Sequence, residues 1–150
     1  LISQNWRTIF AAKLGISAIQ PQDEGLINAL LTLMIDGQAD FTNTFAALGS
    51  TSARDQFIKP KKYDIWEIEW QTRIATEKDP HALMAKSNPV LIPRNHRIEE
   101  MISAAIIGDY APFQRLQRAV SAPFEQNSEF TDLRLGPSIA QEVKATFCGT

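Results

Sequence analysis

The sequence predicts an all-α fold, a compact bundle of about six or seven short helices in one domain over residues 1–150. Apolar residues recur every three or four positions in most segments, which is the spacing of one helix face. Glycine, proline and aspartate separate these segments, as is typical of helix ends. Apolar residues make up 44% of the chain, which is enough for a buried core.

The first three helices follow one another closely. The first runs from the start of the chain to Gly15, a typical stop. The second lies within residues 20–37, and its acidic first turn, beginning with Asp23, favours the positive end of the helix dipole. The third begins at about Asp40, whose carboxylate we expect to cap it, and ends at Gly49.

The middle of the chain is predicted to hold a loop and two helices. Residues 50–60 are small and polar and indicate a loop. Residues 61–77 fit a helix face, although part of them also alternates as a strand would. The helical positions are Tyr63, Trp66, Trp70 and Ile74, and the alternating ones are Ile65, Glu67 and Glu69. We predict a helix because the pattern exceeds about 12 residues. Residues 79–89 form a short helix between two prolines.

Two further helices and a tail complete the prediction. Residues 94–108 carry an apolar stripe at helical spacing. The stripe consists of Ile98, Met101, Ile102, Ala105 and Ile106. Asp109 is expected to cap the next helix, which Pro123 stops. Residues 125–150 are weakly patterned, so we predict a weakly structured tail with at most a short helix around Ser138 to Lys144.

Charge and hydropathy exclude several partners. The net charge of −2 argues against a general nucleic-acid binder, and no apolar run reaches the length of about 18 residues that a membrane span needs. One cysteine makes no internal disulfide, so a reducing, cytoplasmic setting is expected. The chain opens on Leu1 already in helical pattern, which indicates a segment of a longer protein.

Ligands for a metal or a cofactor are sparse in the sequence. His81 and His96 are far apart and Cys148 is remote, so we predict no metal site. All seven glycines are isolated from one another, whereas a phosphate-binding loop needs several together. We therefore expect no cofactor bound by this segment itself.

Two other groups of residues have structural rather than catalytic interpretations. The carboxylate pairs Glu67/Glu69 and Glu99/Glu100 point to different helix faces and are expected at the solvated surface. Aromatic residues at core spacing more commonly pack than stack on bases. These residues are Trp6, Trp66 and Trp70.

A third group begins the helix after Pro93. Arg94, Asn95 and His96 could bind an anion at the helix N-terminus. The alternative, which we favour, is that the prolines shape a turn while Arg94 pins it to a carboxylate.

Cys148 is the candidate functional residue. A thiol two residues from the chain end is poorly placed for catalysis, which needs rigid support, so a thiol enzyme is the weakest interpretation. Such a thiol can bridge reversibly to another cysteine, or it can have no role. The residues alone favour the latter.

Several stretches in order resemble the C-terminal region of the selenoprotein O family. They are "AAKLGI", "DFTNTFAAL", "SNPVLIPRNHRIEEMISAAIIGDYAPFQRL", "APFEQNSEF" and the terminal "TFCGT". The resemblance covers essentially the whole chain and rests on the ordered combination rather than on one motif.

The resemblance implies a function for the longer protein. Members of the family have a kinase-like core that binds ATP with Mg²⁺ or Mn²⁺ and transfers AMP to Ser, Thr or Tyr of proteins. This chain would be the helical C-terminal part, packing on that upstream core without catalysis of its own. Cys148 matches the family's cysteine at the third position from the end, which implies a redox-regulatory disulfide with a cysteine of the core. Within this chain it is expected to be a free thiol.

The resemblance also sets the location and leaves one alternative. It implies a bacterial cytoplasmic protein, or a mitochondrial one in a eukaryote. The alternative is a stand-alone helical module that binds a partner protein through an apolar groove. An upstream kinase-like sequence in the same reading frame would decide between the two.

Overall fold

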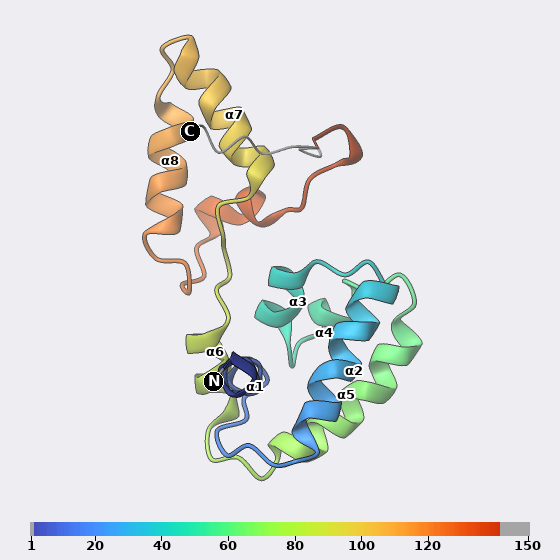
Figure 1. Cartoon of the computed structure of the whole chain (residues 1–150). Coiled ribbons are helices and arrows are strands. Elements are labelled where there is room, and N and C mark those ends of the chain that lie inside the picture. The colour runs from blue at the N-terminus through green and yellow to red at the C-terminus, as the bar shows by residue number, and fades with distance from the viewer. Residues whose placement is uncertain (1, 142–150) are drawn as a thin grey trace. The chain divides into compact units, whose positions relative to one another are not determined.

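The computed structural model describes residues 2–141, which form helices joined by loops and turns (Figure 1). Within that range it has eight α-helices, two 3₁₀ helices and no strand, which confirms the all-α prediction. The chain divides into two compact units, residues 1–89 and residues 90–150, and each is described by itself. The prediction of one domain stays a prediction.

Unit 1, residues 1–89, holds six helices, five of them at or near the predicted positions. They are α1 (Ile2–Lys13), α2 (Asp23–Asp36), α3 (Phe41–Ala47), α4 (Thr51–Arg54), α5 (Pro60–Ile74) and α6 (Pro80–Ser87). The loop prediction for residues 50–60 is wrong in one respect, since α4 makes one turn there. The turn forms because Ala53 is fully buried against the core and anchors it.

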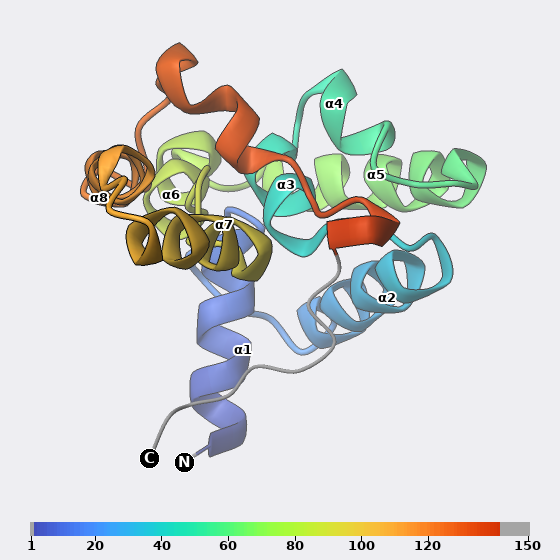
Figure 2. The same cartoon turned by 90° about the horizontal axis from the view of Figure 1, so that it is seen from above.

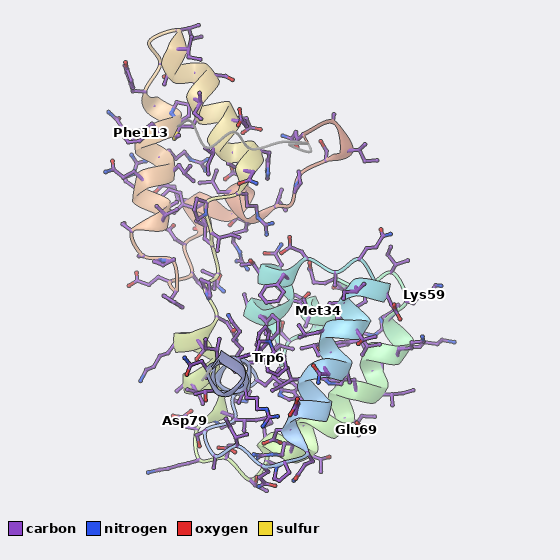
Figure 3. The ribbon with its side chains drawn as sticks, in the orientation of Figure 1. Trp6, Met34, Lys59, Glu69, Asp79 and Phe113 are labelled. Atoms are coloured by element: carbon purple, nitrogen blue, oxygen red, sulfur yellow. The ribbon has the colours of Figure 1, made fainter. Side chains whose placement is uncertain are left out.

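Helices α2 and α5 supply seven of the fifteen buried apolar residues in the core of unit 1, and they run antiparallel and side by side (Figures 1 and 2). Near one end of the pair, Ile58 N–H donates to the carbonyl of Gly37 at 3.2 Å. Further along, the indole N–H of Trp66 donates to the carbonyl of Leu26 at 2.9 Å. These bonds fix the register, and Lys59 and Glu69 point outward from the pair (Figure 3).

The first and last helices of unit 1 are joined end to end. The Lys13 ammonium donates to the carbonyl of Ser87 at 3.0 Å, and the Asn88 amide donates to the carbonyl of Lys13 at 2.8 Å. Gly15 lets the chain leave α1 here with φ of +79°, and a Cβ at this position would lie 2.9 Å from Pro80. The helix stop predicted at Gly15 is therefore also a close packing contact.

Unit 2, residues 90–150, is built on a helical hairpin. Its elements are α7 (Asn95–Ile106), α8 (Ala111–Val120) and the 3₁₀ helices η1 (Ser128–Arg134) and η2 (Ile139–Gln141). The hairpin turns at Gly108, and the backbone N–H groups of Val90 and Leu91 both donate to the carbonyl of Pro123. The sequence pattern does not predict η1. η2 lies within the short helix predicted around Ser138, and the rest of that helix lies outside the described residues.

Candidate functional site

The most buried polar cluster of unit 1 joins the end of α5 to the loop before α2. The Arg73 guanidinium binds both oxygens of Asp23, at 2.7 and 3.0 Å, and also donates to Glu77 at 2.8 Å. Ser17 donates to the other Glu77 oxygen from both its N–H and its hydroxyl. The Ser17 hydroxyl, helped by Arg73, lowers the pKa of Glu77. All three charges are satisfied internally, so this cluster stabilises the fold.

Unit 2 has an open groove of about 320 Å³ between α7, α8 and η1. Its charged lining residues are Arg97, Glu100, Asp109, Arg115 and Asp132. Arg115 binds both oxygens of Asp132, at 2.8 and 2.6 Å, and donates to the carbonyl of Glu129 at 2.6 Å. The Arg115 guanidinium lowers the pKa of Asp132 to about 2. The pair thereby fixes η1 against α8.

Arg97 and Glu100 together tie α7 to the two 3₁₀ helices. Arg97 donates to the carbonyl of Asp132 at 3.0 Å and to the carboxylate of Glu100 at 2.7 Å. The Gln141 amide donates to the other Glu100 oxygen at 2.8 Å. The Arg97 guanidinium lowers the pKa of Glu100. Both groove arginines thus already face carboxylates of this chain.

The predicted carboxylate pairs do not come together as acid–base partners. Glu69, Glu99 and Glu100 are exposed, as predicted. Glu67 accepts a hydrogen bond from the Tyr63 hydroxyl at 3.2 Å, and Glu100 lies in the groove.

His96 lies at the start of α7 but is buried, with 4% of its surface exposed. Its Nε2 has no hydrogen-bond partner among the residues that the structure describes. Burial and the neighbouring Arg97 cation lower the pKa of His96, so the neutral imidazole is favoured. Arg94 precedes the helix in extended conformation, and Asn95 is its exposed first residue. The turn interpretation and the anion alternative both stay predictions.

The tryptophans pack in the core of unit 1, as predicted. Trp66 and Trp70 stack with ring centroids 5.7 Å apart and planes 7° apart. The indole N–H of Trp70 donates to the carbonyl of Leu14 at 2.9 Å. Trp6 is partly buried against Phe10. Satisfied, mutually stacked indoles serve packing rather than base recognition.

A metal site needs several donor side chains close together. Among residues 2–141, no three His, Cys, Asp or Glu side chains gather where they could hold a metal ion. Cys148, the predicted redox residue, lies outside the described residues. In the same range, no helix combines the length and hydropathy that a bilayer crossing requires.

Similarity to known proteins extends over the whole chain. It is 53% identical over 150 residues to the protein nucleotidyltransferase YdiU of Ruegeria sp. (strain TM1040), covering 100% of this chain and 32% of that protein. The YdiU protein of Ruegeria pomeroyi is 47% identical over 150 residues with the same coverage, and that of Bacillus mycoides is 37% identical over 97% of this chain and 31% of its own length. The chain thus spans about a third of the length of these relatives. The family model described as protein adenylyltransferase SelO matches residues 1–121. The chain belongs to the SelO family.

Proposed function

We propose that this chain is the C-terminal helical part of a SelO-type nucleotidyltransferase that transfers AMP from ATP to Ser, Thr or Tyr of proteins. The observation that carries the proposal is the 53% identity over all 150 residues to a protein nucleotidyltransferase of which the chain covers 32%. The alternative of a stand-alone interaction module explains the helical fold equally well. The stand-alone alternative does not explain why all 150 residues match one segment of a protein about three times as long.

In this proposal the segment supports catalysis without performing it. ATP and Mg²⁺ or Mn²⁺ would be held by the upstream kinase-like core, and protein substrates would be partners of the whole enzyme. The isolated glycines and the arginine-paired carboxylates of this segment support that division, because phosphoryl-type catalysis depends on positioned phosphate and metal ligands. A bacterial cytoplasmic location belongs to the same proposal.

Cys148 is proposed as the redox-regulatory residue. Its thiol would form a reversible disulfide with a cysteine of the core, and an oxidant would take up two electrons while two protons leave. Reduction by a thiol would restore both groups. The resemblance of the stretch "TFCGT" around Cys148 to the family pattern supports this role.

The test compares this chain with a long chain. The long chain carries the upstream two thirds of the Ruegeria sp. TM1040 relative followed by these 150 residues. Each is incubated with ATP, Mg²⁺ or Mn²⁺ and acceptor proteins, and mass spectrometry detects added AMP. We expect transfer by the long chain only.

Transfer by the 150-residue chain alone would overturn its supporting role. A long chain that is inactive while the unaltered relative is active would overturn the proposal as a whole. For the thiol, oxidation is expected to change the activity of the long chain reversibly, and Cys148→Ser is expected to remove that response. An unchanged response in the variant would show that Cys148 is not the regulatory residue.

A further inference from the structure

The end of the α7–α8 hairpin exposes an apolar surface. This surface, the hairpin end, is formed by residues 101–113. Its exposed apolar side chains are Ile102, Ile106, Ile107, Tyr110 and Phe113, the last labelled in Figure 3. Ile106 and Ile107 are 79% and 83% exposed. Asp109 is the single charged residue among these thirteen positions. Apolar surface with depleted charge is typical of the centre of a protein interface.

Other exposed isoleucines of the chain have a different setting. Ile65 and Ile68 also face solvent on α5. They lie in residues 58–69, where six of twelve residues are charged. Apolar side chains that are surrounded by charges are ordinary on a monomer surface. The hairpin end therefore differs in composition, and not only in exposure, from the outer face of α5.

The interior of unit 2 is small. Among its described residues, six apolar side chains are buried, against fifteen in unit 1. They are Val90, Leu91, Leu116, Ala119, Phe130 and Leu133. On α7 only His96 is buried, so the apolar stripe predicted for that helix remains half-exposed or exposed. A core this small gives little stability, and a further apolar partner would complete it.

We propose that the hairpin end docks on the upstream part of the same polypeptide. The inference rests on the proposed function, because it takes the chain to be the C-terminal part of a longer enzyme. The relatives contain about two thirds of their length outside the matched segment, which supplies a partner of sufficient size. That partner is covalently linked, so its effective concentration at the hairpin end is on the order of millimolar. This concentration is higher than that of a second copy of the chain.

The experiment measures thiol accessibility at the hairpin end. Ile107→Cys is made in the 150-residue chain and in the long chain described above, both with Cys148→Ser. Ile68→Cys on α5 is the matched control, since Ile68 is also largely exposed, at 68% against 83% for Ile107. Alkylation rates are read for each site by peptide mass spectrometry. We expect Ile107→Cys to react about tenfold more slowly in the long chain, and Ile68→Cys to change less than about twofold.

Three outcomes would overturn the inference. Equal rates at Ile107→Cys in both chains would show a free surface, and Ile106→Cys serves as a second site for the same measurement. Equal slowing of alkylation at Ile68→Cys would show that the long chain slows the reaction at both sites rather than at the hairpin end alone. Slower alkylation of the 150-residue chain as its concentration rises would identify a second copy as the occupant.

AMP transfer by the long chain is measured separately, so an active long chain with an unprotected hairpin end refutes docking alone. Slow alkylation at Ile107→Cys in a long chain that does not transfer AMP refutes the proposed activity alone.

Discussion

Arg73→Met is expected to destabilise unit 1 strongly. Among the described residues, Arg73 is the only cation that forms an ion pair with Asp23 or with Glu77. The Asp23 side chain is 1% exposed and that of Glu77 is 6% exposed. The same guanidinium donates to the carbonyl of Ala18 at 2.8 Å and so holds the loop before α2. The substitution keeps most of the side-chain volume and removes the charge.

The expected loss of unfolding free energy is about 3–5 kcal/mol, the usual cost of leaving a buried charge without its partner. Domains of this size have a total stability of about 5–15 kcal/mol, so the loss is a large fraction of it. With a urea dependence of about 2 kcal/mol per molar, the unfolding midpoint moves down by about 2 M.

Tryptophan fluorescence in urea is the assay, because all three tryptophans of the chain lie in unit 1. Arg54→Met is the matched control in the same unit. Arg54 makes an equally short bidentate contact, with Asp64 at 2.7 and 3.1 Å, but its side chain is 46% exposed. Solvent screens such pairs, so we expect the control to keep a midpoint close to that of the unaltered chain.

A midpoint for Arg73→Met that matches the Arg54→Met control would refute the argument that burial sets the cost. The double variant Asp23→Asn/Arg73→Met provides a second check. Removing both partners eliminates the uncompensated charge on Asp23, so the double variant is expected to lose about 1–3 kcal/mol less than the sum of the two single variants.

Two further predictions concern His96 and Gly15. Because the folded-state pKa of His96 lies below its ordinary value of 6.5, the unfolded chain binds more protons at acid pH. Thermal stability is therefore expected to fall as pH drops below 6.5 towards 5, and His96→Asn is expected to flatten this slope; an unchanged slope would contradict the argument. Gly15→Ala is expected to lower stability by about 1–2 kcal/mol or more through its φ of +79° and contact with Pro80, whereas Gly25→Ala, with nothing within 4 Å, is expected to raise it by about 0.5–1 kcal/mol. Urea unfolding followed by fluorescence measures both glycine variants, and a loss of stability in both would show that conformation at Gly15 is not the cause.

Local sequence patterns predicted most of the helices because the capping residues and the apolar face of each helix lie within its own sequence. Asp40 caps α3 by accepting from the Asn43 N–H at 2.8 Å, as its position before an apolar helix indicates. The strand alternative for residues 61–77 is wrong, since α5 extends over fifteen residues. The helical pattern prevails over the strand alternation there because four buried residues share one helix face.

Tertiary contacts decide the features that sequence reasoning missed. The residues of η1 carry no extended apolar period, and the helix is fixed by Arg115 reaching Asp132, seventeen positions away. Arg73 and Asp23 are fifty positions apart, so neither neighbourhood predicts their pairing. The burial of His96 likewise depends on what packs around α7.

The contact between the ends of α1 and α6 also governs how unit 1 can fold. Lys13 and Asn88 are 75 positions apart, so α1 cannot take its final place until α6 has been synthesised. At about 5–20 residues per second, the nascent chain carries α1 without this partner for about 4–15 s. During that time the α1 side chains that end in the core, such as Ala11 and Phe10, are open to chaperones. The packing of α1 in unit 1 is therefore completed only after α6 has been synthesised.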